Sequence, residues 1–202
     1  MQQSSSPDTV ESRILEIARA HIRKFGAGRA TIVGVAQDAG MTHANVYRYF
    51  PSKATLFEEI TASWLRPIEN RLREVAEGPA PSDDKLESML MTVHRAYRQK
   101  LEGDAALFDL LIEALEGDRP VARRHRARVQ SEVQRVVEEG IASGAFAMND
   151  RRRAMALIFD AAHRFIHPVA LKLDKEVAGA ALAARFETIV GMMLRTLRAG
   201  RT

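Results

Sequence analysis

The 202-residue sequence contains no cysteine, so disulfide bonds and thiol chemistry are excluded. It also has no apolar run near the roughly 20 residues that a membrane-spanning helix needs. The first ten residues, MQQSSSPDTV, lack the basic start and the apolar segment of a secretory signal. Together these absences predict a soluble, cytoplasmic protein.

The motifs of several enzyme classes are missing as well. There is no Gly-rich phosphate loop, no nucleophile elbow and no second carboxylate-rich motif. Asp160, His163 and His167 have a spacing that could place metal ligands on one helix face, which leaves a metal-dependent enzyme as the weaker alternative. However, Arg164 stands where an HExxH metalloprotease would carry its glutamate, and Pro168 follows the second histidine. We therefore predict no enzyme activity, no metal and no cofactor.

The formal net charge of +4 lies mainly near the N-terminus. Residues 1–53 hold seven Lys and Arg against four Asp and Glu, which leaves only a small excess for the rest of the chain. A mildly basic N-terminal segment is weak evidence for a polyanionic partner such as DNA.

Strand-like alternation of apolar residues is nearly absent, whereas three- and four-residue spacing is common, so the sequence predicts an all-α fold of about nine helices. The first helix should begin at Asp8, with Glu11 completing a capping box. Its apolar face is predicted to contain Val10, Ile14, Ile17, His21 and Phe25. A fourth helix should start at Ser52 and bend at Pro67. Further helices are expected near residues 83–101, 105–116, 120–142, 150–172 and 175–198.

The stretch GMTHANVYRYFPSKATLF, residues 40–57, is unusually polar and aromatic for a buried helix. Thr31 is a plausible N-cap of a short helix that ends at Gly40, and Thr42 is a plausible N-cap of another that ends before Pro51. Two short helices joined at a glycine outline a helix-turn-helix, whose second helix enters the major groove of DNA.

This role accounts for the composition of the second short helix. Its first turn would read base edges, and its later residues would contact the DNA backbone. The residues predicted for base reading are Thr42, His43 and Asn45, and those predicted for the backbone are Tyr47, Arg48, Tyr49 and Lys53. Val46 and Phe50 should face a small core with Phe25 and Val35. The alternative is that the tyrosines merely cover a helix junction.

The segment VAQDAGMTHANVYRYFPSKATLF resembles the N-terminal domain of the tetracycline-repressor (TetR) family of bacterial transcription regulators. The residues that fit are Val35-Ala36, Ala39-Gly40, Tyr47, Tyr49-Phe50 and Ser52-Lys53. The resemblance covers roughly residues 9–60 and implies DNA contacts at Thr31, Thr42, His43, Asn45, Tyr47, Tyr49 and Lys53. The sequence departs from the family pattern in two places: His43 stands where a lysine is common, and Val33-Gly34 stands where the family often carries polar or charged residues. A glycine inside a helix is unfavourable by about 0.5–1 kcal/mol, so this helix should be less stable unless another group approaches closely there.

The resemblance implies an all-helical second domain that binds a small molecule and dimerises through its last two helices. The implied division is a disordered tail (1–8), a helix-turn-helix domain (9–55) and a ligand-binding and dimerisation domain (56–202). The last two helices are rich in apolar and small residues, and the predicted interface contains Phe165, Ala180, Ala184, Ile189, Met193 and Leu197. The alternative is that both helices face the core of a monomer.

A ligand pocket is predicted from aromatic residues and histidines at helical spacing, although such residues often form ordinary core. The candidates are Trp64, His94, Tyr97, Phe108, Phe159 and His163. The arginine-rich run at 119–130 is interpreted as a solvated helix face, with extra phosphate contact as the alternative. The sequence thus predicts a homodimeric repressor that leaves a palindromic operator when a small apolar effector binds. A helix-turn-helix protein without an effector remains the alternative.

Overall fold

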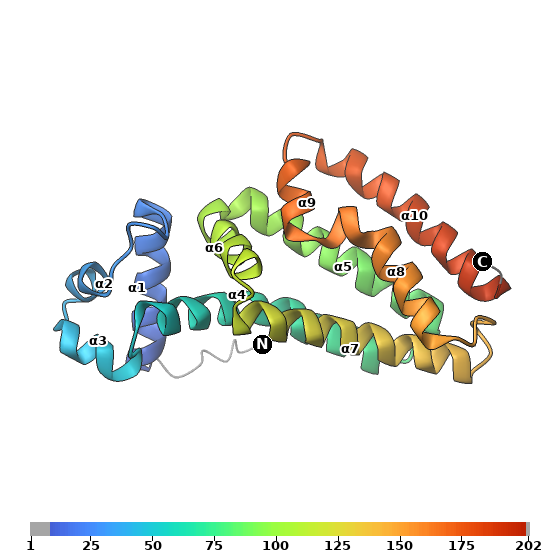
Figure 1. Ribbon diagram of the computed structural model, residues 1–202, viewed down its shortest axis with the longest axis horizontal. Helices are drawn as coiled ribbons and strands as arrows, with labels where there is room; N and C mark the ends of the chain where they lie inside the picture. The colour runs from blue at the N-terminus through green and yellow to red at the C-terminus, as the bar shows by residue number, and fades with distance from the viewer. Residues whose placement is uncertain (1–8, 201–202) are drawn as a thin grey trace, which may run out of the picture. The chain divides into compact units, whose positions relative to one another are not determined.

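The computed structural model describes residues 9–200, so the predicted tail and the predicted cap Asp8 lie outside the described residues. The described residues form helices joined by loops, without strands, which confirms the predicted all-α class (Figure 1). Its helices are α1 (Val10–Phe25), α2 (Ile32–Asp38), α3 (His43–Tyr49), α4 (Lys53–Glu77), α5 (Ser82–Gly103), α6 (Ala105–Glu116), α7 (Pro120–Ala142), α8 (Arg151–Ile166), α9 (Pro168–Leu173) and α10 (Gly179–Ala199). None of these helices is long and apolar enough to cross a membrane.

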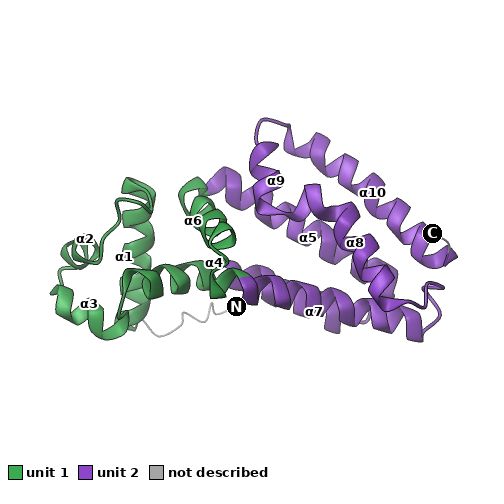
Figure 2. Cartoon of the chain, viewed as in Figure 1, with its two compact units in different colours: residues 1–64, 104–122 green, residues 65–103, 123–202 purple. Residues whose placement is uncertain are grey.

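The chain divides into two compact units (Figure 2). Unit 1 comprises residues 1–64 and 104–122, and unit 2 comprises residues 65–103 and 123–202. Helices α4 and α7 each contribute residues to both units. The predicted domain limit at residue 55 concerns function rather than compactness, and it stays a prediction.

The core of unit 1 joins α1, α2, α3, the start of α4 and α6. Ile14, Val46 and Phe50 are buried in it, as predicted for Val46 and Phe50. Phe25, which was expected in this core, is instead 40% exposed. It is the last residue of α1, and the centroid of its ring lies 4.6 Å from that of the His21 ring and 4.9 Å from Lys24 Nζ.

Two prolines have different consequences for the predicted helices. Pro67 lies inside α4, and the helix continues to Glu77. By contrast, the helix expected at 150–172 is divided into α8 and α9, because His167 adopts an extended backbone and Pro168 begins the next helix. Proline is well suited to a first helical position, since its missing N–H would have no partner there.

Unit 2 is built mainly from α5, α8, α9 and α10 together with the C-terminal parts of α4 and α7. The rings of Phe165 on α8 and Phe186 on α10 stack at 4.7 Å between centroids, and both side chains are buried. His94 on α5 lies 5.3 Å from the Phe186 ring. These contacts fix α5, α8 and α10 around one apolar core.

Candidate DNA-binding surface and regulatory core

Side-chain caps define both short helices of the predicted helix-turn-helix. The Thr31 hydroxyl accepts a hydrogen bond from the Gly34 N–H at 3.0 Å, and the Thr42 hydroxyl accepts one from the Asn45 N–H at 3.2 Å. Gly40 stands between the helices with φ of +64°, a left-handed conformation that glycine adopts without steric penalty. The glycine turn predicted from the sequence is therefore present.

A close contact between α1 and α2 explains the glycine inside α2. His21 donates from Nδ1 to the Asp38 carboxylate at 2.6 Å, which holds its ring against α2. A Cβ atom at position 34 would lie only 2.7 Å from His21 Cε1. The departure from the family pattern at Gly34 is thus the place where the His21 ring enters.

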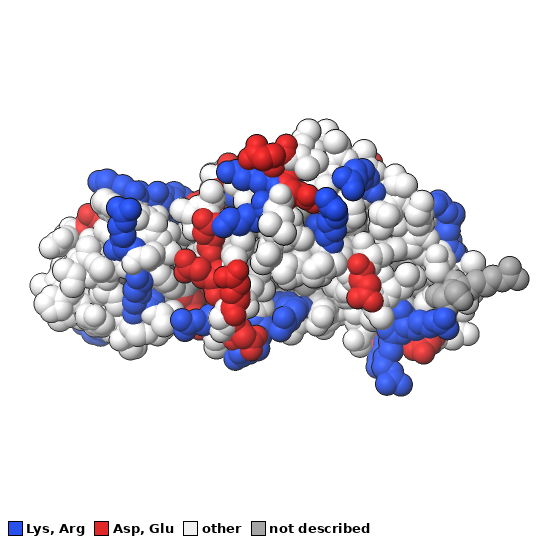
Figure 3. Space-filling view, turned by 45° about the horizontal axis from the view of Figure 1, so that its top comes forward, with Lys and Arg blue, Asp and Glu red and all other residues white. Residues whose placement is uncertain are grey.

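The predicted reading helix α3 has one buried and one exposed face. Val46 is buried, whereas Thr42, His43, Tyr47 and Arg48 are exposed. Tyr47 is 45% exposed, and its ring meets the His43 ring edge to face at 6.5 Å between centroids. In Figure 3 the end of the molecule that carries α1–α3 shows Lys and Arg side chains with little Asp or Glu. This face can offer hydrogen-bond donors and positive charge to a polyanion.

Two of the residues predicted to contact DNA have partners within unit 1. Lys53 donates from Nζ to the Gly28 carbonyl at 3.4 Å and lies 5.0 Å from the Phe57 ring centroid. Arg48 packs over the Tyr49 ring at 5.2 Å and donates to its hydroxyl at 3.2 Å. These contacts hold long side chains in place near α3, which lowers the entropy lost when they bind a phosphate.

The six predicted ligand residues are divided between the two units. Trp64 and Phe108 belong to unit 1, where their rings meet edge to face at 6.3 Å. The other four belong to unit 2, and they are His94, Tyr97, Phe159 and His163. Of the six, His94 lines an open pocket of about 530 Å³ between α5 and the start of α10.

Tyr97 belongs to a buried polar chain that the sequence analysis missed. Its hydroxyl lies 2.7 Å from His125 Nε2, and His125 Nδ1 donates to the Glu69 carboxylate at 2.8 Å. Glu69 and His125 are only 7% and 5% exposed. The predicted solvated face of the arginine-rich run holds for Arg123, Arg124, Arg126 and Arg128, which are exposed, but is wrong for His125.

The environment of this chain shifts two pKa values. Burial raises the pKa of the Tyr97 hydroxyl, and the Glu69 charge adds to that effect. Burial alone would also raise the pKa of Glu69, but hydrogen bonds from His125 and Arg128 outweigh it and lower the pKa. Glu69 is therefore an anion and Tyr97 a neutral phenol at physiological pH.

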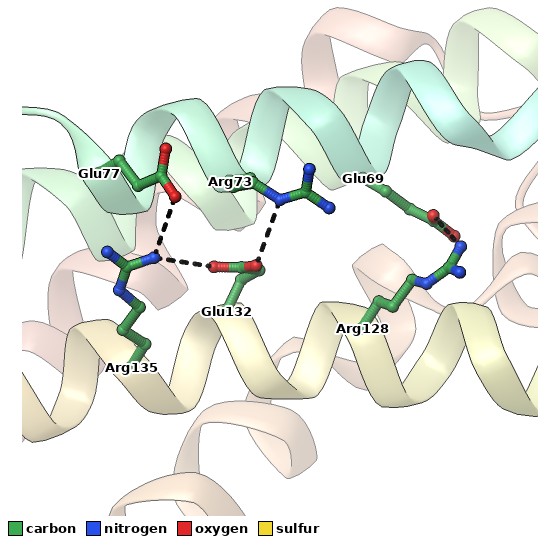
Figure 4. Close-up of polar contacts among 6 residues, drawn as sticks. All are labelled: Glu69, Arg73, Glu77, Arg128, Glu132 and Arg135. Atoms are coloured by element: carbon green, nitrogen blue, oxygen red, sulfur yellow. Dashed lines mark hydrogen bonds and ion pairs between the residues drawn. The ribbon is translucent and has the colours of Figure 1, made fainter.

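Glu69 also begins a row of ion pairs between α4 and α7 (Figure 4). Arg128 donates to Glu69 at 2.5 Å, and Arg73 lies 4.0 Å from Glu132. Glu77 and Arg135 close the row at 3.4 Å. The charges alternate along both helices, so a slip of one turn would bring like charges together. The pairs thus favour one register of α4 on α7.

The structure separates the predicted dimer residues into two groups. Phe165, Met193 and Leu197 are buried inside unit 2, so for them the alternative of a monomer core applies. Ala180 and Ala184 are exposed, and Ile189 is half-buried. Met193 and Leu197 are buried because they lie on the side of α10 that faces α5 and α8. Phe165 on α8 is buried where its ring stacks on Phe186.

The possible metal ligands do not converge. The rings of His163 and His167 stack at 4.6 Å with planes 21° apart, and His167 has already left the helical conformation. Burial lowers the pKa of His167, and the charges of His163 and Arg126 add to this effect. Within residues 9–200, no group of three or more His, Asp or Glu side chains could hold a metal ion.

Comparison with known proteins covers both parts of the chain. Residues 14–60 match the model of the bacterial regulatory proteins of the tetR family, and residues 82–190 match that of the tetracyclin repressor-like C-terminal domain. An uncharacterised HTH-type transcriptional regulator from Mycobacterium tuberculosis is 27% identical over 179 residues, which cover 85% of this chain and 87% of the relative.

Similar folds occur among solved structures. FadR from Bacillus subtilis, in complex with stearoyl-CoA, is 19% identical with a TM-score of 0.65, and the match covers 95% of this chain and 99% of FadR. SmeT, the repressor of the multidrug efflux pump SmeDEF of Stenotrophomonas maltophilia, is 16% identical with a TM-score of 0.69, over 94% of this chain and 90% of SmeT.

The second family model alone covers more than half of the chain, and the first contains the whole helix-turn-helix. Members of this family are DNA-binding regulators rather than enzymes, which agrees with the predicted lack of enzyme activity. The capped α2–turn–α3 segment and the helical second unit are the structural counterparts of the two models. The chain is therefore a transcriptional regulator that belongs to the TetR family.

Proposed function

We propose that this protein is a ligand-responsive repressor that binds a palindromic operator as a homodimer and leaves it when a small effector binds. The observation that carries the proposal is the exposed face of α3, which combines a capped N-terminus with Thr42, His43, Tyr47 and Arg48 above the buried Val46. A helix N-terminus attracts phosphate oxygens, and exposed polar side chains can read base edges.

The two solved structures support the proposed repression and the proposed binding of an effector. SmeT is a repressor, and FadR was solved with stearoyl-CoA bound. Helix α4 offers a route from an effector to DNA, because it begins beside α3 in unit 1 and ends in unit 2. To change DNA affinity tenfold, an effector need favour one arrangement of the protein by only about 1.4 kcal/mol.

Dimerisation would use the faces of α8 and α10 that the protomer leaves uncovered. On α10 the exposed residues Ala184, Thr188 and Met192 follow one another at steps of four, so they form one stripe. This stripe replaces Phe165, Met193 and Leu197 in our proposal, while Ala180 and Ala184 remain candidates.

Selection of bound duplexes from a random library tests the proposal. We expect enrichment of inverted repeats with half-sites one or more helical turns apart, because each α3 is too short to be specific alone. Sedimentation in the presence of the selected duplex should give two protomers per site. Specific binding by a single protomer to a non-repeated sequence would contradict it.

Lys53 provides a quantitative test of the DNA surface. Lys53→Ala should weaken binding to all sequences and reduce the slope of log K against log salt by about one unit, because one phosphate contact is lost. Asn45→Ala should instead relax preference at particular base pairs by about 1–3 kcal/mol. Titrations over a range of salt concentrations measure both effects, and an unchanged slope for Lys53→Ala would refute the phosphate contact.

A further inference from the structure

The pocket of about 530 Å³ in unit 2 has a mixed polar and small-residue lining. Helix α5 supplies one wall with His94, Arg95, Arg98, Gln99 and Glu102, and α10 supplies the other with Gly179, Ala180 and Ala183. The small residues of α10 leave room for a flat ligand to approach its backbone. Pockets of this volume hold small organic molecules when a few polar groups converge in them.

His94 lines this pocket, and only one of its two ring nitrogens has a hydrogen-bond partner among the described residues. Its side chain is 1% exposed, and its Nδ1 lies 2.8 Å from the Phe165 carbonyl oxygen. A carbonyl can only accept, so Nδ1 carries the proton. Burial lowers the pKa of His94, as do the charges of Arg98 and Arg95, and the ring is therefore neutral with a lone pair on Nε2. No described residue hydrogen-bonds to Nε2.

An anion would meet the arginines of this pocket by replacing a carboxylate that pairs with one of them. Arg95 lies 3.6 Å from Glu187 and Arg98 donates to Glu102 at 2.7 Å, so two glutamates balance the two arginines, while His94 is neutral. The N-terminus of α10 has no side-chain cap and adds a partial charge of about +0.5. A ligand carboxylate in place of Glu102 would keep this balance.

In the free protein, the Glu102 carboxylate occupies the place beside Arg98 and the start of α10. Its carboxylate accepts from Arg98 Nη2 at 2.7 Å and lies 3.6 Å from the position of a Cβ at Gly179. Its side chain is nevertheless 58% exposed, so it can turn into solvent. Arg98 is held by carbonyls of Asp174 and Val177, and would stay in place when Glu102 leaves.

We propose that this pocket binds a small organic acid that carries a hydroxyl group. The carboxylate replaces Glu102 beside Arg98 and the start of α10, and the hydroxyl donates to His94 Nε2. The inference deepens the proposed function and rests on it for its regulatory meaning, but the binding itself can be measured without DNA.

Three simple compounds test the chemistry by calorimetry on the full-length protein. They are 3-hydroxybenzoate, benzoate without the hydroxyl, and 3-hydroxybenzyl alcohol without the charge. His94→Asn keeps the donor to the Phe165 carbonyl but removes the Nε2 acceptor. It should therefore lower the affinity for 3-hydroxybenzoate about tenfold, the loss expected for one hydrogen bond, and leave the affinity for benzoate unchanged. Far-UV circular dichroism and thermal unfolding establish that the variant is folded.

Two isosteric substitutions at exposed positions provide a matched pair, and thermal unfolding checks the fold of each variant because Glu102 is the carboxylate partner of the buried Arg98. Glu102→Gln removes a negative charge and should strengthen binding of both acids about threefold, whereas Gln99→Glu adds one and should weaken it by a similar factor. The neutral alcohol should respond to neither change. If no acid binds at millimolar concentration, or if all three compounds respond equally to the pair, the proposed acid site is wrong.

A separate measurement distinguishes this inference from the repressor function. The selected operator duplex is titrated with protein in the presence of saturating 3-hydroxybenzoate. If the acid binds with the expected variant pattern but operator affinity is unchanged, the pocket stands and effector-driven release fails. If operator affinity falls while His94→Asn, Glu102→Gln and Gln99→Glu all leave acid binding unchanged, the acid acts elsewhere and the pocket assignment is overturned.

Discussion

Replacement of Glu69 by alanine is expected to lower the free energy of unfolding by about 1–3 kcal/mol, the usual cost of leaving a buried polar group without its hydrogen-bond partner. Glu69 accepts from both His125 and Arg128 in a site that is almost closed to solvent. Arg128 can turn to water, since its side chain is 56% exposed, but His125 and Tyr97 cannot. Urea unfolding, followed by circular dichroism, measures the change.

The other end of the same row of ion pairs provides a matched control. Glu77 pairs with Arg135 at 3.4 Å, and both side chains are more than half exposed. Exposed pairs stabilise proteins by about 0–1 kcal/mol, so Glu77→Ala should have little effect on the free energy of unfolding. Equal losses for Glu69→Ala and Glu77→Ala would show that burial of the network is not what makes Glu69 important.

The lowered pKa of Glu69 also predicts how stability depends on pH. An unfolded Glu69 would titrate near its ordinary value of 4.5, whereas the folded protein holds the carboxylate charged to lower pH. The stabilisation is therefore complete above about pH 4.5 and is lost as the pH falls through the folded pKa. Glu69→Gln should be less stable than the wild type at neutral pH, and the difference should shrink in acid.

Replacement of Gly34 by alanine is expected to destabilise unit 1 and to weaken operator binding. The added methyl group would lie 2.7 Å from a His21 ring that Asp38 holds in place, so α1 and α2 must move apart. Overpacking of this kind lowers stability by about 1–3 kcal/mol, whereas alanine in a helix gains only about 0.5–1 kcal/mol over glycine. The clash should therefore dominate, and α3 would shift with α2.

A double-mutant cycle separates the clash from other effects of the substitution. In a His21→Ala background the ring is absent, and Gly34→Ala should then be neutral or stabilising because only the helix propensity remains. Thermal unfolding and operator titration of the four proteins give the coupling energy. If Gly34→Ala lowers stability equally in both backgrounds, contact with His21 is not the reason for glycine at this position.

Local patterns were sufficient to predict the DNA-binding segment. The caps at Thr31 and Thr42, the turn at Gly40 and the end before Pro51 depend on residues within a few positions of each other. The alternation of buried Val46 with exposed Tyr47 follows from the period of one short helix. For this reason the segment could be interpreted without knowledge of the rest of the chain.

Helix packing in unit 2 could not be predicted in the same way. The sequence identified an apolar stripe on α10, but Met193 and Leu197 turn toward α5 and α8 while Met192 faces solvent. Which side of an apolar helix meets its own protomer depends on the neighbouring helices. Periodicity alone therefore placed core residues in the expected dimer interface.

The sequence by itself determined the helical class, the helix-turn-helix and the family, because each depends on short-range spacing of residue types. Only the tertiary structure decided that His21 meets Gly34, that His125 is buried beside Glu69, and that His94 lines a pocket with Arg98. In the buried chain, Tyr97 is 28 residues from His125, and His125 is 56 residues from Glu69. Contacts over such separations arise when distant helix faces pack together, and no local pattern specifies which faces will meet.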